Sequence, residues 1–205
     1  EKRHIFLGNV AEQHPEAATI HALTQEIAKL TGASFGFLGE AANSLGGYVA
    51  GALPTANGLN AYEMLAQPRK AYVVLGAELD RDAHNAQLAT AALKQAAFSV
   101  VLTSFKDGSV AETADALLPI APFTETSGTF VNAEGRVQSF NGVVKPQGDA
   151  RPGWKVLRVL GNVLDLSGFD FESSEAVRDS AVAKNADFVT GLDNGLKDVT
   201  PVMVA

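Results

Sequence analysis

Short apolar runs, each of the length typical of a buried strand, are spaced along the first two thirds of the chain. They are rich in β-branched and aromatic residues and are bounded by glycine, asparagine or proline, which favour turns. We predict one strand in each run. The predicted strands cover residues 3–8, 34–38, 71–76, 98–103 and 116–120.

Polar and apolar residues follow a helical period between these runs. Ile20, Leu23, Ile27 and Leu30 recur at three- and four-residue spacing, and Gly32 is a predicted C-cap. Strands that alternate with helices predict an α/β fold, with an open, mostly parallel Rossmann-like sheet and helices on both faces. Five further helices are predicted. The first covers residues 40–53, the second begins at Asn60 with a capping box, and the third runs from Asp80 or Asp82 to about residue 97. The fourth begins at Ser109, and the fifth runs from Pro152 to Gly168.

A β-hairpin is predicted directly after the fifth strand. Pro119 and Pro122 cannot donate to a ladder, so the fifth strand ends there and the chain crosses in an extended form. The stretches 128–131 and 136–140 have strand character, and the four residues 132–135 tolerate positive φ. We expect the two arms to pair antiparallel.

Composition and charge exclude several classes of protein. Hydrophobic residues make up 46% of 205 residues, yet no apolar run approaches the roughly 20 residues that span a bilayer. The net charge of −7 argues against sequence-independent nucleic-acid binding, which requires basic patches. The absence of cysteine excludes disulfides, thiolate nucleophiles and cysteine-ligated iron–sulfur clusters in this chain.

The pattern changes after Gly168. Between Asp170 and Asp198 there are seven acids and three bases, a net charge of −4, with few large apolar residues. We therefore predict an α/β domain over residues 1–168 and an acidic C-terminal tail over residues 169–205, either a partly ordered arm or disordered in isolation.

One long ordered string resembles a known family. Residues 114–119 have the pattern A-D-x-L-L-P, and residues 125–138 have the pattern E-T-S-G-T-F-V-N-x-E-G-R-V-Q. Together these two stretches resemble the segment shared by molybdopterin oxidoreductases. The continuation through Lys145-Pro146 and Arg151-Pro152-Gly-Trp154 most closely resembles the C-terminal region of the large iron–sulfur subunit of bacterial NADH:quinone oxidoreductase, complex I. The resemblance covers about residues 3–171.

This resemblance implies a non-catalytic, structural part of the peripheral arm of complex I. Iron–sulfur clusters would then lie elsewhere in the parent subunit, and none is expected in this segment. The implied partners are the N-terminal part of the same subunit and other peripheral-arm subunits, on the cytoplasmic side of the bacterial inner membrane, with neither nucleic acid nor direct membrane insertion. A chain that starts within a strand and without Met fits a piece of a longer protein.

The loops after the first three strands are the candidate ligand site. In an open α/β sheet, ligands sit beyond the carboxyl ends of the strands, and in molybdopterin enzymes the corresponding loops hold the pyrophosphate and guanine of the cofactor. Because Glu78 and Asp80 add two carboxylates, at roughly 1 to 4 kcal/mol per like-charge pair unless Arg81 offsets them, we expect a vestigial pocket without bound cofactor. No G-x-G-x-x-G fingerprint occurs. The candidate residues are Gly8, Asn9, Asn43, Ser44, Gly76 and Glu78.

Other polar residues suggest little chemistry. His14 and His21 lie two turns apart on one predicted helix face and are expected at a solvated surface, and Asp80, Asp82 and His84 alternate along the chain without converging on a metal.

Catalysis at a serine or a carboxylate pair is not supported either. Ser44, Ser109 and Ser127 lack a His and Asp arrangement. We expect one of Glu125 and Glu134 at the hairpin tip in solvent and the other bracing the crossing. Arg136 is expected to form an ion pair with Glu125 or Asp115.

Two alternatives stay open. The chain fits the nucleotide-cofactor-binding domain of a molybdopterin enzyme such as a formate dehydrogenase or nitrate reductase, which an upstream molybdenum ligand would favour. It also fits a stand-alone interaction module that uses the hairpin and the tail, for which deletion beyond Gly168 would abolish assembly but not folding.

Overall fold

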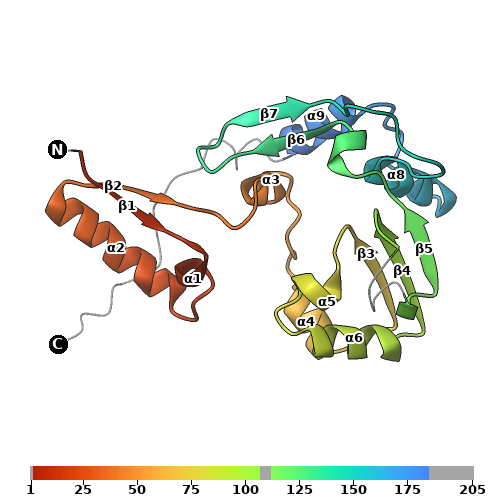
Figure 1. Ribbon diagram of the computed structural model, residues 1–205, viewed down its shortest axis with the longest axis horizontal. Coiled ribbons are helices and arrows are strands. Elements are labelled where there is room, and N and C mark those ends of the chain that lie inside the picture. The colour runs from red at the N-terminus through yellow and green to blue at the C-terminus, as the bar shows by residue number, and fades with distance from the viewer. Residues whose placement is uncertain (1, 107–111, 185–205) are drawn as a thin grey trace. The chain divides into compact units, whose positions relative to one another are not determined.

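The computed structural model describes residues 2–106 and 112–184. These residues form two compact units, each with its own parallel sheet (Figure 1). Unit 1 comprises residues 2–51, 129–138 and 181–184, and unit 2 comprises residues 52–106, 112–128 and 139–180. No helix in the described ranges is long and apolar enough to cross a membrane.

Unit 1 contains the first βαβ unit that the sequence predicts. Strands β1 (His4–Leu7) and β2 (Ser34–Phe37) pair in parallel, with His4 opposite Ser34. Helix α2 (Ala17–Thr31) connects them and ends at Gly32, whose φ of 65° is a left-handed C-cap, as predicted. The helix begins after Glu16 and is preceded by the short helix α1 (Asn9–Glu12).

The predicted helix over residues 40–53 forms only in its middle. Helix α3 covers Ser44–Val49 and contains Gly46 and Gly47, which weaken a helix because they lose more backbone entropy than other residues. Its N-cap is Asn43.

Unit 2 contains a three-stranded parallel sheet in the order β3-β4-β5, with bounds close to the prediction. Tyr72, Val74 and Val101 on one face join Ala92 and Leu93 in a buried cluster. The strands are β3 (Ala71–Leu75), β4 (Phe98–Thr103) and β5 (Ala116–Pro119).

Helices cover both faces of this sheet. Helix α4 (Ala61–Ala66) begins with the predicted capping box, in which the Asn60 side chain accepts the N–H of Glu63 at 2.9 Å. Helix α6 (Ala86–Gln95) supplies the buried cluster. On the face opposite Val74, the first residue of α8 (Gly153–Val163) packs against the Leu75 side chain.

The predicted cap of α6 is wrong. Neither Asp80 nor Asp82 begins this helix, because both belong to the separate short helix α5 (Leu79–Asp82). The N-cap of α6 is Asn85, whose side-chain oxygen accepts the N–H of Leu88 at 2.9 Å. The helix predicted from Ser109 begins outside the described residues.

The predicted hairpin is present. After the 3-10 turn η1 (Phe123–Glu125), strands β6 (Gly128–Val131) and β7 (Val137–Phe140) pair and run in opposite directions (Figure 1). The turn is closed by the Asn132 N–H, which donates to the Arg136 carbonyl at 3.1 Å. The turn belongs to unit 1 and the base of the hairpin to unit 2.

The α/β fold class is therefore confirmed, with the parallel strands divided between two sheets. The proposed domain boundary at residue 168 stays a prediction. The predicted tail begins with helix α9 (Ser174–Lys184), and residues 185–205 lie outside the described part of the chain.

Candidate functional site

The carboxyl ends of β1 and β2 place four of the six candidate residues in unit 1. Because the two strands are parallel, the loops that follow them leave the same edge of the sheet. Gly8 is the N-cap of α1, and its carbonyl accepts the N–H groups of Ala11 at 2.9 Å and of Glu12 at 3.1 Å. Gly8 and Asn9 therefore form a tight helical turn directly after β1.

Asn43 has a structural role at the start of α3. Its side-chain oxygen accepts the N–H of Val131 at 2.8 Å, which fastens the hairpin to the start of this helix. Ser44 donates its hydroxyl to the carbonyl of Ala41 at 3.3 Å. Both polar side chains are thus engaged within the protein.

A pocket of about 520 Å³ lies between the loop after β2, α3 and the hairpin turn, and we call it the unit 1 pocket. Its walls are mainly aromatic and aliphatic, and Glu134 is its single charged lining residue among those described. None of the lining residues that the structure describes is a base that could neutralise a pyrophosphate. The lining residues are Phe37, Gly39, Ala41, Ser44, Leu45, Tyr48, Val131, Ala133, Glu134 and Gly135.

The loop after β3 carries the other two candidates, Gly76 and Glu78, and lies in unit 2. The N–H of Gly76 donates to the Leu102 carbonyl at 2.8 Å and thereby extends the pairing of β3 with β4. The N–H of Glu78 donates to the carboxylate of Asp82 at 2.7 Å. The N–H groups of Gly76 and Glu78, two of the backbone donors of this loop, therefore already have acceptors within the protein.

Charge at this loop is also unfavourable for an anion. Arg81 lies 2.9 Å from the Glu78 carboxylate, so the base that was expected to offset the acids is paired with one of them. Asp80 and Asp82 remain as further negative charges on α5. A pyrophosphate group does not fit here, because it would compete with the Asp82 carboxylate for the Glu78 N–H and would be repelled by the acids.

Metal-ligating residues do not converge in the described ranges. No group of three or more His, Asp or Glu side chains there is placed to hold a metal ion. Since the chain has no cysteine, thiolate ligands are also excluded.

His21 differs from the expected surface residue. Its ring stacks on Phe35, with centroids 5.0 Å apart, and meets Phe37 edge-on at 4.8 Å. Burial against these rings lowers the pKa of His21 because it disfavours the charged imidazolium. His14, by contrast, accepts the N–H of Glu16 in the turn before α2.

The two glutamates divide as predicted. Glu134 is exposed in the hairpin turn, whereas the Glu125 carboxylate accepts the N–H of Gln147 at 3.0 Å and braces the crossing. Asp115 accepts the N–H of the buried Ser99 at 2.7 Å and its hydroxyl at 3.1 Å. The ion pair of Arg136 with Glu125 or Asp115 stays a prediction.

The predicted lack of a serine nucleophile also stays a prediction. Ser127 donates its hydroxyl to the Asn141 side chain at 3.4 Å. Ser109 lies outside the described residues.

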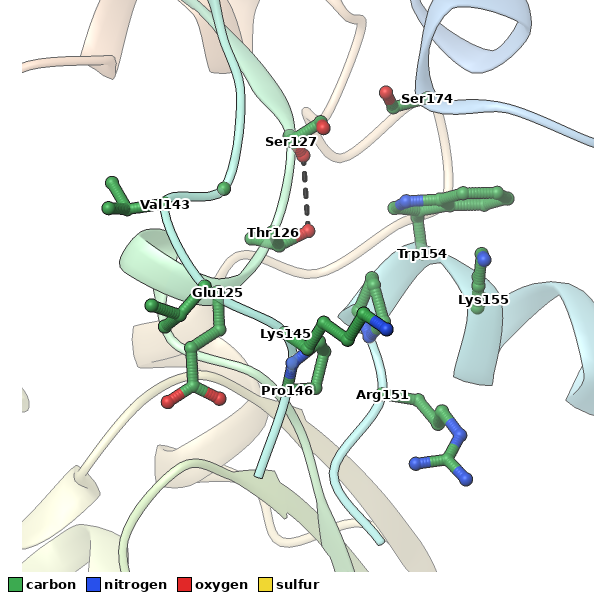
Figure 2. A pocket seen from close by; sticks show the side chains of 13 residues that line it. Glu125, Thr126, Ser127, Val143, Lys145, Pro146, Arg151, Trp154, Lys155 and Ser174 are labelled. Atoms are coloured by element: carbon green, nitrogen blue, oxygen red, sulfur yellow. Dashed lines mark hydrogen bonds between the residues drawn. The ribbon is translucent and has the colours of Figure 1, made fainter. Parts of the chain in front are cut away.

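A second pocket, of about 620 Å³, was missed by the sequence reasoning (Figure 2). It lies in unit 2, between the chain after β7 and the start of α8, and we call it the basic pocket because Lys145, Arg151 and Lys155 line it. The concentration of bases around the predicted start of α8 was the signal that could have revealed it. The other lining residues are Glu125, Thr126, Ser127, Gly142, Val143, Val144, Pro146, Pro152, Trp154 and Ser174.

Comparison with protein families and with curated proteins identifies relatives of this chain. A family described as molybdopterin oxidoreductase matches residues 1–163. The mitochondrial NADH-ubiquinone oxidoreductase 78 kDa subunit of Candida albicans is 48% identical over 52 residues, which are 25% of this chain and 7% of that protein.

Two bacterial relatives match longer stretches. The probable oxidoreductase YjgC of Bacillus subtilis is 32% identical over 133 residues, which are 63% of this chain and 13% of that protein. A protein of Staphylococcus aureus named as a formate dehydrogenase is 38% identical over 82 residues, which are 40% of this chain and 8% of that protein. The chain therefore matches only a small part of the length of each of these relatives.

Proposed function

Because the chain belongs to the molybdopterin oxidoreductase family, we propose that it is a non-catalytic structural domain of the large iron–sulfur subunit of respiratory NADH:quinone oxidoreductase. In this proposal the domain completes the peripheral arm of the complex. Electrons pass from NADH to quinone through iron–sulfur clusters held elsewhere in the subunit, because this chain contains no cysteine ligand.

The bond between the Glu78 N–H and the Asp82 carboxylate carries this proposal. A dinucleotide-binding loop after a parallel strand leaves its amide donors free for phosphate. Here a carboxylate of the protein takes that place, and Glu78 and Asp80 add like charge. The loop is therefore suited to a structural turn and not to a cofactor.

The similarity to the NADH-ubiquinone oxidoreductase subunit supports the same function. Its 48% identity over 52 residues is the highest identity among the three relatives described above, although it covers the shortest stretch. The proposed partners are the N-terminal part of the same subunit and neighbouring peripheral-arm subunits, at the cytoplasmic side of the bacterial inner membrane.

Metal and pterin analysis of the purified full-length subunit tests this function. We expect iron in the parent subunit, with molybdenum, tungsten and pterin each far below one equivalent. Stoichiometric molybdenum or tungsten together with a pterin would overturn the structural function.

The second candidate function is the nucleotide-cofactor-binding domain of a molybdopterin enzyme of the formate dehydrogenase or nitrate reductase kind. It is favoured by the length of the matches to YjgC and to the Staphylococcus aureus protein. The sequence upstream in the parent protein separates the two functions. A Cys, selenocysteine, Ser or Asp ligand to molybdenum favours the enzyme, whereas a ferredoxin-like cysteine set without such a ligand favours complex I.

A further inference from the structure

Two lysines from different segments line one cavity in unit 2. Lys145 follows the hairpin and Lys155 lies in the first turn of α8, and both line the basic pocket of about 620 Å³. Figure 2 shows the Lys145 side chain extending toward the side of the pocket formed by Trp154 and Lys155. Within the described part of the chain, neither ammonium group forms an ion pair.

The acids near the pocket are engaged by other groups. The Glu125 carboxylate accepts the N–H of Gln147, and in Figure 2 it points away from Trp154. Outside the lining, Glu175 accepts the hydroxyl of Ser174 at 3.2 Å. Both carboxylates keep their negative charge, but in the described part of the chain neither forms an ion pair with Lys145 or Lys155.

Arg151 has a structural role at the pocket, because its guanidinium is bonded to carbonyl groups of the protein. One of its terminal nitrogens donates to the carbonyls of Gly148 at 3.2 Å and Ala150 at 2.8 Å. This holds the loop that leads into α8. In Figure 2 its guanidinium points away from Trp154.

The start of α8 adds positive potential to the same cavity. Its N-cap is Pro152, which offers no side-chain cap, and its first turn contains no acid but does contain Lys155. Acids are stabilising and bases destabilising at this position, because the N-terminal end of a helix carries partial positive charge. The helices α4 and α6 of the same unit begin with the asparagine caps Asn60 and Asn85. The charge at the start of α8 is therefore unfavourable unless an external anion offsets it.

Trp154 provides a flat apolar wall beside these cations. Figure 2 shows its indole at the pocket, and the ammonium of Lys155 lies 5.4 Å from the ring centroid. Pockets of roughly 300–1,000 Å³ hold small organic ligands. An indole next to ammonium groups and helix N–H groups suits a phosphate ester with a planar or apolar part better than it suits a bare metal ion.

We propose that the basic pocket binds the phosphate group of a small phosphorylated ligand, through Lys145, Lys155 and the first turn of α8. The chemistry is shared by free phosphate and by a nucleotide, whose base would lie against Trp154. This site is separate from the strand-end loops and does not depend on the proposed function.

Trp154 is the single tryptophan of the sequence, so its intrinsic fluorescence reports on this pocket. The full chain is titrated at low ionic strength with ADP and with inorganic phosphate, and with sodium chloride as the ionic-strength control. We expect a saturable change in the fluorescence of Trp154 with ADP. Inorganic phosphate should give the same change if the phosphate group alone is enough for binding. Added salt should weaken the binding, because the charges are exposed.

Matched lysine variants assign the signal. Lys145→Gln should weaken binding about fivefold, the upper end for an exposed charge pair. Lys70→Gln removes an exposed lysine of the same unit outside the pocket and should bind like the unchanged protein. Lys155 is not substituted in this experiment, because its ammonium lies close to the indole of Trp154 and its loss would change the fluorescence of the free protein.

Saturation by both ligands identifies a general phosphate site, and saturation by ADP alone identifies a nucleotide site. The proposal is overturned if neither ligand saturates, or if Lys145→Gln and Lys70→Gln bind alike while circular dichroism shows both folded. It is also overturned if an oligoglutamate peptide binds more tightly than ADP and phosphate, because the pocket would then be a docking site for an acidic protein segment.

Discussion

The unit 1 pocket and the basic pocket have similar volumes, about 520 and 620 Å³, but opposite chemistry. The first is lined mainly by apolar side chains and contains one acid among its described lining residues, whereas the charged lining residues of the second are three bases and one acid. The net charge of −7 predicts neither, since it averages over the whole chain. Local charge depends on which segments the fold brings to one cavity.

The polar groups of the two pockets are also used differently. Beside the unit 1 pocket, the Asn43 side chain accepts the Val131 N–H and holds the hairpin to the start of α3, and the lining residue Ser44 donates its hydroxyl to Ala41 in its own loop. In the basic pocket, the polar contacts of Glu125 and Arg151 hold the walls, and the lining residues Lys145 and Lys155 form no ion pair in the described part of the chain. We infer that the first pocket is a structural joint and that the second is suited to a ligand.

The largest expected effect comes from closing the basic pocket. A methyl group at Gly142 would lie 2.9 Å from backbone atoms of Glu125 and Thr126, which cannot move as a side chain end can. Gly142→Ala should cost about 3 kcal/mol of unfolding free energy, the upper part of the range for overpacking. It should also abolish ADP binding.

The matched control lies in the unit 1 pocket. A methyl group at Gly39 meets nothing within 4 Å, so Gly39→Ala should leave stability nearly unchanged. Urea denaturation measures both variants. Equal losses would contradict the tight packing of the chain after β7 on residues 125–126.

The joint of the unit 1 pocket is the next target. Asn43→Ala removes the acceptor of the Val131 N–H, and Val131 is buried. An unsatisfied buried donor costs about 2 kcal/mol, which chemical denaturation should detect. Asn43→Asp retains an acceptor oxygen and should recover most of this loss. If both variants lose the same stability, the hydrogen bond is not what fastens the hairpin.

The third target is the acidic loop after β3, where the Asp82 carboxylate accepts the Glu78 N–H. Asp82→Ala frees the Glu78 N–H and should cost about 1 kcal/mol, as the loss of a helix cap does. Asp80→Ala, which removes a neighbouring carboxylate on the same short helix, is the control for charge alone. Thermal unfolding of both variants separates the bond from the charge, and equal shifts would argue against the role of Asp82.

The smallest expected effect is a pH dependence beside the unit 1 pocket, where His21 contacts the lining residue Phe37. The pKa of His21 is lowered in the folded protein because burial disfavours its charged form. The unfolded chain therefore binds the proton more readily, and the stability contributed by neutral His21 is complete above about pH 6.5 and is lost as pH falls below it.

His21→Phe keeps an aromatic ring against Phe35 and Phe37 and removes the titration. Denaturation at a series of pH values should show a shallower loss of stability toward acid in this variant than in the unchanged protein. Parallel curves would show that His21 does not contribute to the pH dependence.

Local structure was largely predictable because its causes are local. The bounds of β4, the left-handed cap at Gly32 and the capping box of Asn60 and Glu63 follow from neighbouring side chains and backbone geometry. The cap of α6 was not predictable in this way. Asp80, Asp82 and Asn85 are all suitable caps, and the position of the helix was decided by the packing of Ala92 and Leu93 on β3 and β4.

The sequence identified candidate site residues, but it did not predict how the fold distributes them or which groups they bond. The sequence indicated Gly8, Asn9, Asn43, Ser44, Gly76 and Glu78, and their positions at helix starts and strand ends are as expected. The structure assigns the first four to unit 1 and the last two to unit 2. It also shows that the Asn43 oxygen and the Glu78 N–H have partners within the protein.

By itself, then, the sequence determined the α/β class, the five parallel strands, the hairpin and the family, because periodicity and a long ordered motif are properties of contiguous residues. Only the tertiary structure decided the division of the parallel strands between two sheets and the position of Lys145 beside Lys155 and Trp154. Strand pairing and cavity lining join residues distant along the chain, and their energies depend on packing that a linear pattern does not contain.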